Sequence, residues 1–297
     1  MARGVLAPLC IAVLTAVSSL CGTAVAQGHE APVPPVAAAA GVVAPKRVVS
    51  INLCTDQLAM MLAAPGQLHS VSYLSADPRG SAMAEAAQGY ALNHARAEEI
   101  WLMQPDLVVA GSFASRATVD MLKRLGVPVA VMEPAYGLSD IPARLREMGA
   151  ALGRQAEAEK AARDFEARLS TLSAEVADQP RAALYFANGY TSGDKTLAGE
   201  ILAAAGFANV AAEVGLPSGG HMPLEVLAME EPDAVITGRR YPGASRSEAV
   251  MAHPVIRILQ HETTGASLTD RDWICGTPHV LRAIEGMREL RLRMGRS

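Results

Sequence analysis

Short apolar runs alternate with amphipathic segments along most of this chain. The apolar runs have the length and composition of strands buried on both faces, and the segments between them have helical spacing. Before residue 139, strands are predicted at 47–51, 68–72, 107–110 and 127–132, and helices at 55–63, 98–103 and 117–125. After residue 180, strands are predicted at 182–186, 208–210, 234–237 and 266–268, and helices at 197–205, 224–229, 247–259 and 278–292. This alternation predicts an α/β fold of two lobes with parallel sheets and right-handed crossovers.

The segment between the lobes is predicted to be helical. Apolar residues recur at helical spacing from Ile141 to Leu152, and Gly153 is placed to end that helix. A second helix is predicted over residues 154–177, with a length of about 36 Å at 1.5 Å per residue. One long rigid helix joining two lobes would limit them to small-amplitude closure around a ligand in a cleft between them.

A sequence repeat supports the two-lobe organisation. Residues 98–111 (EEIWLMQPDLVVAG) and 225–238 (EVLAMEEPDAVITG) share one layout, offset by 127 positions (225 − 98). Each copy predicts a short helix, a Pro-Asp break, a buried strand and a final glycine, because proline disfavours helix at the residue before it. The offset is too long for a solenoid and fits two related lobes.

The first residues have the pattern of a secretory signal peptide. Arg3 precedes an apolar run over residues 5–20, and Ala24-Val25-Ala26 is a suitable cleavage site. An uncleaved anchor is the alternative, and a lipoprotein reading of Cys21 is weakened by Leu20 before it. We therefore expect an exported, periplasmic protein whose mature chain is not inserted in the membrane. The predicted organisation is a signal peptide (1–26), a flexible leader (27–45), an N-terminal lobe (46–138), a linker (139–180) and a C-terminal lobe (181–297).

Composition and charge narrow the function classes. The net charge of −4 argues against nucleic-acid binding, which needs a basic surface to neutralise phosphates. Only 4% of the residues are aromatic, six Tyr, four Phe and two Trp, so their positions are informative.

Candidate ligand-binding residues follow from the predicted strand ends. Ligands of parallel α/β sheets bind outside the carboxyl ends of the strands. The residues at these ends are Asn52, Tyr73, Ser112, Phe113, Tyr136, Asn188, Tyr190, Arg239, Arg240, Tyr241, Asp272 and Trp273. Six of the twelve aromatic residues fall in this set, whereas packing in a core would place most of them inside strands and helices. The pattern favours a large, partly apolar ligand, and the arginines could meet its carboxylate or phosphate groups.

Motifs of catalysis are missing from the sequence. It has no G-x-S-x-G, G-x-G-x-x-G, phosphate-binding loop or C-x-x-C, and its histidines do not pair at metal-ligand spacing on one helix. We therefore expect no enzyme, no cofactor and no metal site, with an exported enzyme on the same scaffold as the remote alternative. Cys54 and Cys275 remain after signal cleavage and could form a disulfide, stay as separate thiols or form a reactive thiol or metal site.

Three segments resemble the periplasmic binding proteins of iron-siderophore, haem and vitamin B12 uptake. These are RVVSINLCTDQ at residues 47–57, PDLVV at 105–109 and WICGTP at 273–278. The resemblance covers about residues 45–292 and implies two α/β lobes, a rigid connecting helix, a chelate held between the lobes and delivery to an inner-membrane ABC transporter. We expect a monomer that binds and releases its ligand.

The resemblance also implies a docking role for two glutamates. In the vitamin B12-binding members, one surface glutamate per lobe contacts arginines of the permease dimer, and it stands seven residues before the proline of the repeat. Those positions are Glu98 and Glu225 here. The alternative is that both are ordinary first-turn glutamates that favour a helix N-terminus.

The sequence leaves three classes of ligand as alternatives. The opening motif favours a cobalamin-type corrinoid. Haem often needs an axial Tyr or His, which Tyr73, Tyr136 or His221 could supply, and the arginines at 239 and 240 would suit a ferric siderophore.

Overall fold

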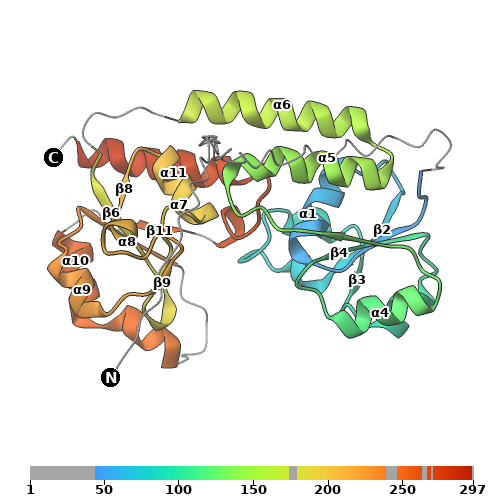
Figure 1. Ribbon diagram of the computed structural model, residues 1–297, viewed down its shortest axis with the longest axis horizontal. Helices are drawn as coiled ribbons and strands as arrows, with labels where there is room; N and C mark the ends of the chain where they lie inside the picture. The colour runs from blue at the N-terminus through green and yellow to red at the C-terminus, as the bar shows by residue number, and fades with distance from the viewer. Residues whose placement is uncertain (1–43, 174–178, 239–245, 263–265, 269, 296–297) are drawn as a thin grey trace, which may run out of the picture. The chain divides into compact units, whose positions relative to one another are not determined.

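Two parallel sheets with flanking helices form the part of the chain that the computed structural model describes (Figure 1). The described residues are 44–173, 179–238, 246–262, 266–268 and 270–295. Within them, no helix is long and apolar enough to cross a membrane. We call each sheet with its helices a lobe.

The first lobe contains a five-stranded sheet in the order β3-β2-β1-β4-β5, with every pair parallel. Its strands are β1 (Val48–Ser50), β2 (Leu68–Ser72), β3 (Ala91–Asn93), β4 (Leu107–Gly111) and β5 (Val129–Met132). Its helices are α1 (Leu53–Leu62), α2 (Ala84–Ala87), α3 (Ala97–Leu102) and α4 (Arg116–Arg124), with 3₁₀ turns η1 (Tyr73–Ala76) and η2 (Leu138–Asp140). The edge strand β3 was not predicted, because its first two residues are exposed and it lacks an apolar run.

The second lobe contains a four-stranded parallel sheet in the order β11-β10-β6-β8 and a separate antiparallel pair, β7 with β9. Its strands are β6 (Arg181–Tyr185), β7 (Tyr190–Thr191), β8 (Ala208–Asn209), β9 (Gly220–His221), β10 (Ala234–Gly238) and β11 (Ala266–Leu268). Its helices are α7 (Leu197–Ala204), α8 (Val210–Glu213), α9 (Leu224–Met229), α10 (Pro254–Glu262) and α11 (Val280–Met294), with 3₁₀ turns η3 (Ala187–Gly189), η4 (Arg246–Ala252) and η5 (Asp270–Asp272).

The prediction of a single helix over residues 247–259 is wrong. The structure has η4 followed by α10, and the break falls at His253. Pro254 explains it, because proline disfavours helix at the preceding residue and suits the first position of a new helix.

The central strands of each sheet are buried on both faces, which explains their continuous apolar runs. Successive residues of a strand point to opposite faces of the sheet. In β1, Val48 and Val49 therefore belong to two different core clusters, and so do Ala182 and Ala183 in β6. One large cluster joins the inner faces of both sheets to α5 (Ile141–Leu152), α6 (Gln155–Leu172), α7 and α11. The two lobes therefore share this cluster, and each sheet has a separate cluster on its other face.

The linker is a pair of packed helices. Gly153, in the left-handed conformation with φ of 70°, ends α5 as predicted, and α6 then packs along α5 and contacts α11 (Figure 1). The long helix ends earlier than predicted, because Ser173 is extended; α6 has 18 residues and spans about 27 Å. Residues 174–177 of the predicted helix lie outside the described residues.

The repeat is built in the same way in both lobes. The Asp106 carboxylate accepts hydrogen bonds from the amides of Lys46 (2.6 Å) and Arg47 (2.9 Å), directly before β1. The equivalent Asp233 accepts one from the amide of Arg181 (2.7 Å), where β6 begins. Each aspartate thus fixes the start of the first strand of its sheet.

Arginine contacts complete this equivalence. Arg47 Nε donates to the carbonyl of Met103 (2.5 Å), and Arg181 Nη1 donates to the carbonyl of Glu230 (2.5 Å), 127 positions later (230 − 103). The next residues, Gln104 and Glu231, both have positive φ (51° and 43°). The internal repeat is therefore a repeat of structure as well as of sequence.

Candidate functional site

A pocket opens at the carboxyl end of the first sheet. The strand order reverses direction between β1 and β4, and such a switch point is where open α/β sheets bind ligands. The cavity has a volume of about 230 Å³. Its lining residues are Asn52, Cys54, Thr55, Leu58, Gly111, Ser112, Phe113, Met132, Glu133, Pro134, Ala135, Arg144, Ile274 and Gly276. Three predicted binding residues, Asn52, Ser112 and Phe113, lie together here.

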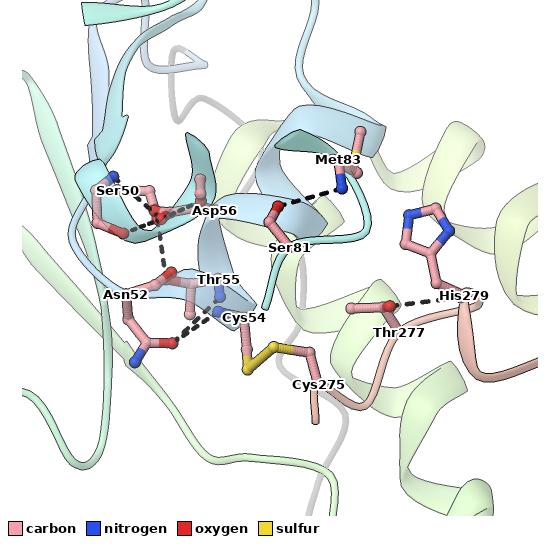
Figure 2. The surroundings of a disulfide bond; sticks show 12 residues. Ser50, Asn52, Cys54, Thr55, Asp56, Ser81, Met83, Cys275, Thr277 and His279 are labelled. Atoms are coloured by element: carbon pink, nitrogen blue, oxygen red, sulfur yellow. Dashed lines mark hydrogen bonds between the residues drawn. A yellow bond between two sulfur atoms is a disulfide. The ribbon is translucent and has the colours of Figure 1, made fainter. Parts of the chain in front are cut away.

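Asn52 occupies the switch point because it caps α1. Its side-chain oxygen accepts hydrogen bonds from the amides of Cys54 (3.0 Å) and Thr55 (3.4 Å), as Figure 2 shows. On β4, Gly111 leaves space for it, since a Cβ there would lie 3.1 Å from the Asn52 Cγ. A Cβ at position 111 would therefore be in tight contact with the Asn52 side chain.

The polar side of the pocket contains a carboxylate and a guanidinium that sequence reasoning missed. The Ser112 hydroxyl donates a hydrogen bond to Glu133 (2.9 Å), which directly follows β5. Arg144 on α5 pairs with Glu147 (2.5 Å) through Nη1, while its buried Nε has no hydrogen-bond partner among the described residues. Glu133 could have been found by the strand-end rule, but Arg144 comes from the linker helix and has no such signal.

The apolar side is formed by residues that lie far apart in the sequence. Phe113 is largely exposed after β4, and Ile274, also exposed, lies next to Cys275 near the C-terminus. Exposed apolar side chains around a pocket suit a partly apolar ligand.

A disulfide joins the C-terminal segment to this pocket. Cys54 in the first turn of α1 is bonded to Cys275, with a Cα–Cα distance of 5.2 Å and a sequence separation of 221 (Figure 2). Gly276 packs closely against Ala135, because a Cβ on the glycine would lie 2.2 Å from the Cβ of Ala135. The segment around Cys275 therefore forms one wall of a pocket whose other lining residues come from the first lobe and from α5.

Other predicted residues of the first lobe lie outside the pocket lining. Tyr73 stacks on His94, with ring centroids 5.0 Å apart, beyond the ends of β2 and β3. Tyr136 is exposed after Ala135, and its amide donates to Asp140 (2.9 Å).

In the second lobe, Asn188, Tyr190 and His221 lie close together after β6. Tyr190 and His221 pair across β7 and β9, and Asn188 has a left-handed conformation (φ 58°) in the turn before them. His221 is also close to Gly189, since a Cβ there would lie 3.2 Å from its Nε2. The predicted residues Arg239, Arg240 and Tyr241 lie outside the described residues.

Trp273 and Asp272 are engaged in contacts of the protein itself. Trp273 packs against Phe186 with ring centroids 4.8 Å apart. The Asp272 carboxylate lies 3.1 Å from Arg282 Nε and 3.5 Å from Arg271 Nε. Trp273 therefore packs partly against the core, and its predicted contact with a ligand stays a prediction.

Two titratable groups close to the disulfide have displaced pKa values. Burial raises the pKa of Asp56, although hydrogen bonds from Ser72 and Ser75 oppose the shift. Burial, together with the charge of Arg282, lowers the pKa of His279 to about 4. Among the described residues, no three His, Cys, Asp or Glu side chains gather as metal ligands would.

The predicted docking residues have equivalent positions. Glu98 is the second residue of α3 and Glu225 the second residue of α9, and both are exposed. Neither carboxylate has a hydrogen-bond or ion-pair partner within the described chain.

A pair of doubly wound sheets on one shared core, with a pocket at a switch point, defines a two-lobed α/β binding protein. The family model described as "Periplasmic binding protein" matches residues 48–259, and the chain belongs to this family.

Similar proteins are found by sequence and by structure. The chain is 26% identical over 228 residues to a cobalamin-binding protein of Halobacterium salinarum, covering 74% of this chain and 62% of that one. It is 25% identical over 245 residues to a vitamin B12-binding protein of Vibrio parahaemolyticus, covering 80% of this chain and 86% of that one. It thus spans 62% of the length of the Halobacterium relative.

Solved structures share the fold. The periplasmic heme-binding protein RhuT from Roseiflexus sp. RS-1 superposes with a TM-score of 0.69 at 19% identity, over 84% of this chain and 98% of that one. The periplasmic vitamin B12-binding protein BtuF of Vibrio cholerae superposes with a TM-score of 0.62 at 19% identity, over 85% and 99%.

Proposed function

We propose that this protein captures a metal chelate of the cobalamin type in the switch-point pocket and delivers it to an ABC importer. The observation that carries the proposal is the pocket itself, where the family fold brings Asn52, Phe113 and Arg144 to one cavity walled by the disulfide-linked segment. The chain binds and releases the ligand, and no bond is broken.

The chemistry of the pocket supports a ligand with both an apolar body and polar edges. Phe113 and Ile274 offer apolar surface, while Asn52, Glu133 and Arg144 offer an amide, a carboxylate and a guanidinium. A corrinoid combines a flat, largely apolar ring with peripheral amides that such groups can bind. A cavity of about 230 Å³ is smaller than the ~300–1,000 Å³ typical of complete ligand sites, so it would hold one edge of the chelate.

The names of the relatives favour cobalamin over the alternatives. The two relatives described above by sequence are cobalamin-binding and vitamin B12-binding proteins, whereas the structural neighbours include a heme-binding protein. Haem or a ferric siderophore is therefore the second candidate, and Arg144 would then meet a propionate or another acidic edge of the ligand.

We further propose that Glu98 and Glu225 dock the protein on a permease dimer. Their equivalent, exposed and unpaired carboxylates support this role, because paired acidic groups match basic groups on a two-fold partner. Delivery also implies export, and the first 26 residues would serve as the signal peptide.

Titration of the mature chain, residues 27–297, decides the ligand. Cyanocobalamin, haemin and ferrichrome are added in parallel and followed by calorimetry. We expect cyanocobalamin to bind with a Kd below micromolar. If none of the three chelates binds more tightly than micromolar, the chelate hypothesis is wrong.

Transport measurements test the docking role. The double variant Glu98→Ala with Glu225→Ala is expected to abolish uptake and to leave the affinity for cyanocobalamin unchanged. A fall in that affinity would count against a docking role for the two residues.

A further inference from the structure

The most exposed large hydrophobic side chains of the described chain are few and unevenly placed. Met229 is 82% exposed, Phe113 79% and Leu102 72%. Phe113 lines the ligand pocket, which explains its exposure. The other two stand 127 positions apart (229 − 102), which is the offset of the repeat. A large hydrophobic side chain is therefore exposed to solvent at the same position of the repeat in both lobes.

Each of these side chains follows one of the predicted docking glutamates by four residues. Leu102 ends α3, which begins with Ala97 and Glu98, and Met229 ends α9 after Glu225. Residues four apart lie on the same face of a helix. Each short helix thus presents an acidic group and an apolar group together on its exposed face.

The opposite faces of both helices are fixed in the core. Ile100 and Leu227, again 127 apart (227 − 100), are completely buried. The buried Ile100 and Leu227 pack the two helices against their sheets. The exposed residues are therefore held in fixed positions.

A single exposed leucine or methionine is common and needs no explanation. Here the exposure recurs at equivalent positions, and it recurs beside an unpaired carboxylate each time. Beside Leu102, a cavity of about 280 Å³ is lined by Trp101, Gln104, Pro105 and Val127. It offers a recess next to the exposed leucine for a side chain of a partner.

We propose that Leu102 and Met229 are the apolar half of a docking surface repeated on both lobes. A partner that matches it must offer a basic group beside an apolar patch at two equivalent places, and the two-fold symmetry of a permease dimer would provide such a pair. The inference rests on the proposed delivery function and adds residues to it. The glutamates set orientation and association rate, and the apolar side chains slow dissociation.

The test measures binding of cyanocobalamin-loaded protein to the permease dimer of its importer, reconstituted in nanodiscs, at several KCl concentrations. The variants are Leu102→Ser, Met229→Ser and their combination, with Glu98→Gln combined with Glu225→Gln for comparison. Met121→Ser is the matched control, because Met121 is an exposed methionine on α4 outside the repeat.

We expect Leu102→Ser and Met229→Ser each to weaken permease binding by about tenfold, mainly through faster dissociation. The salt dependence should stay unchanged in these variants and flatten in the glutamate variant. The affinity for cyanocobalamin should stay within about twofold of the wild type in every variant. The Met121→Ser control should also bind the permease within about twofold of the wild type.

Three results overturn the inference. If only the glutamate variant loses affinity, docking is purely ionic and the apolar role is wrong while the proposed delivery stands. If neither class of variant loses affinity, the delivery surface itself is misplaced. If only one of Leu102→Ser and Met229→Ser weakens permease binding, the docking surface is not repeated on both lobes.

Discussion

His279 lies partly buried in the segment that follows Cys275, as Figure 2 shows. Its Nε2 has no hydrogen-bond partner within the described residues, and its pKa is lowered to about 4. In the unfolded chain this group takes up a proton near pH 6.5, whereas the folded chain excludes the proton until about pH 4. Protonation therefore favours unfolding, and stability is lost as the pH falls from about 6.5 towards 4.

Replacement of His279 by Gln isolates this effect. Between pH 7 and pH 5, the wild type should lose about 1–2 kcal/mol more unfolding free energy than His279→Gln, allowing for the partial exposure of the ring. Urea unfolding at both pH values measures the difference. Parallel pH profiles for the two proteins would show that this histidine does not couple to folding.

Arg144 lines the pocket with a buried guanidinium nitrogen that lacks a hydrogen-bond partner among the described residues. Its buried Nε would gain a partner when a ligand acceptor enters the pocket. Arg144→Gln should weaken cyanocobalamin binding by about tenfold, or ~1.4 kcal/mol. Arg146→Gln is the control, because Arg146 lies on the same helix but pairs with Glu159 away from the pocket. Equal affinities for the two variants would remove Arg144 from the site.

At the scale of residues, sequence reasoning predicted the strand-end residues of the pocket but not the rest of its lining. Asn52, Ser112 and Phe113 follow strands that the apolar runs made visible, so their position at the sheet edge could be predicted. Arg144 and Ile274 reach the pocket from a helix and from a distant segment. Such contacts depend on how elements pack, which periodicity does not encode.

At the scale of elements, the crossing of α5 and α6 decides how the linker packs. Gly149 sits at the contact, where a Cβ would lie 2.2 Å from the Cβ of Ala158. Elements with strong periodicity, such as α5, were predicted closely, whereas α6 stops at Leu172 because Ser173 turns extended. Short edge elements such as β7 have two residues and no readable period.

Two glycine substitutions separate packing from helix propensity. Gly149→Ala should destabilise the protein by about 1–3 kcal/mol, since the helices must move apart. Gly286→Ala, in the interior of α11 with open space at its Cβ, should stabilise it by about 0.5–1 kcal/mol. Both are measured by urea unfolding. A neutral Gly149→Ala would mean that the crossing tolerates a wider spacing.

At the scale of the whole molecule, the lobes are joined by the linker, by a shared cluster, by a disulfide and by hydrogen bonds. The polypeptide passes through α5 and α6, the buried cluster continues across both sheets, and the disulfide ties the C-terminal segment to the first lobe. The amide of Leu138 also donates to Glu200 on α7 (2.6 Å). Together these links restrict relative movement of the lobes, and small-amplitude closure stays a prediction.

Removal of the disulfide tests this arrangement. Cys54→Ser combined with Cys275→Ser should lower the unfolding free energy by about 2–4 kcal/mol, because the bond closes a loop of 221 positions. Cyanocobalamin binding should also weaken, since Ile274 and Gly276 would no longer be held at the pocket. Calorimetry under reducing and non-reducing conditions provides the comparison. Unchanged binding after full reduction would show that packing holds this wall without the bond.

The same bond makes a covalent ring of most of the folded chain. A protease that cuts one peptide bond anywhere between Cys54 and Cys275 opens the ring without releasing a fragment. Such a nicked molecule would migrate as one band in a non-reducing gel and as two bands after reduction. The disulfide would hold the two pieces of a singly nicked protein in one molecule, whereas without the bond only noncovalent contacts would hold them together.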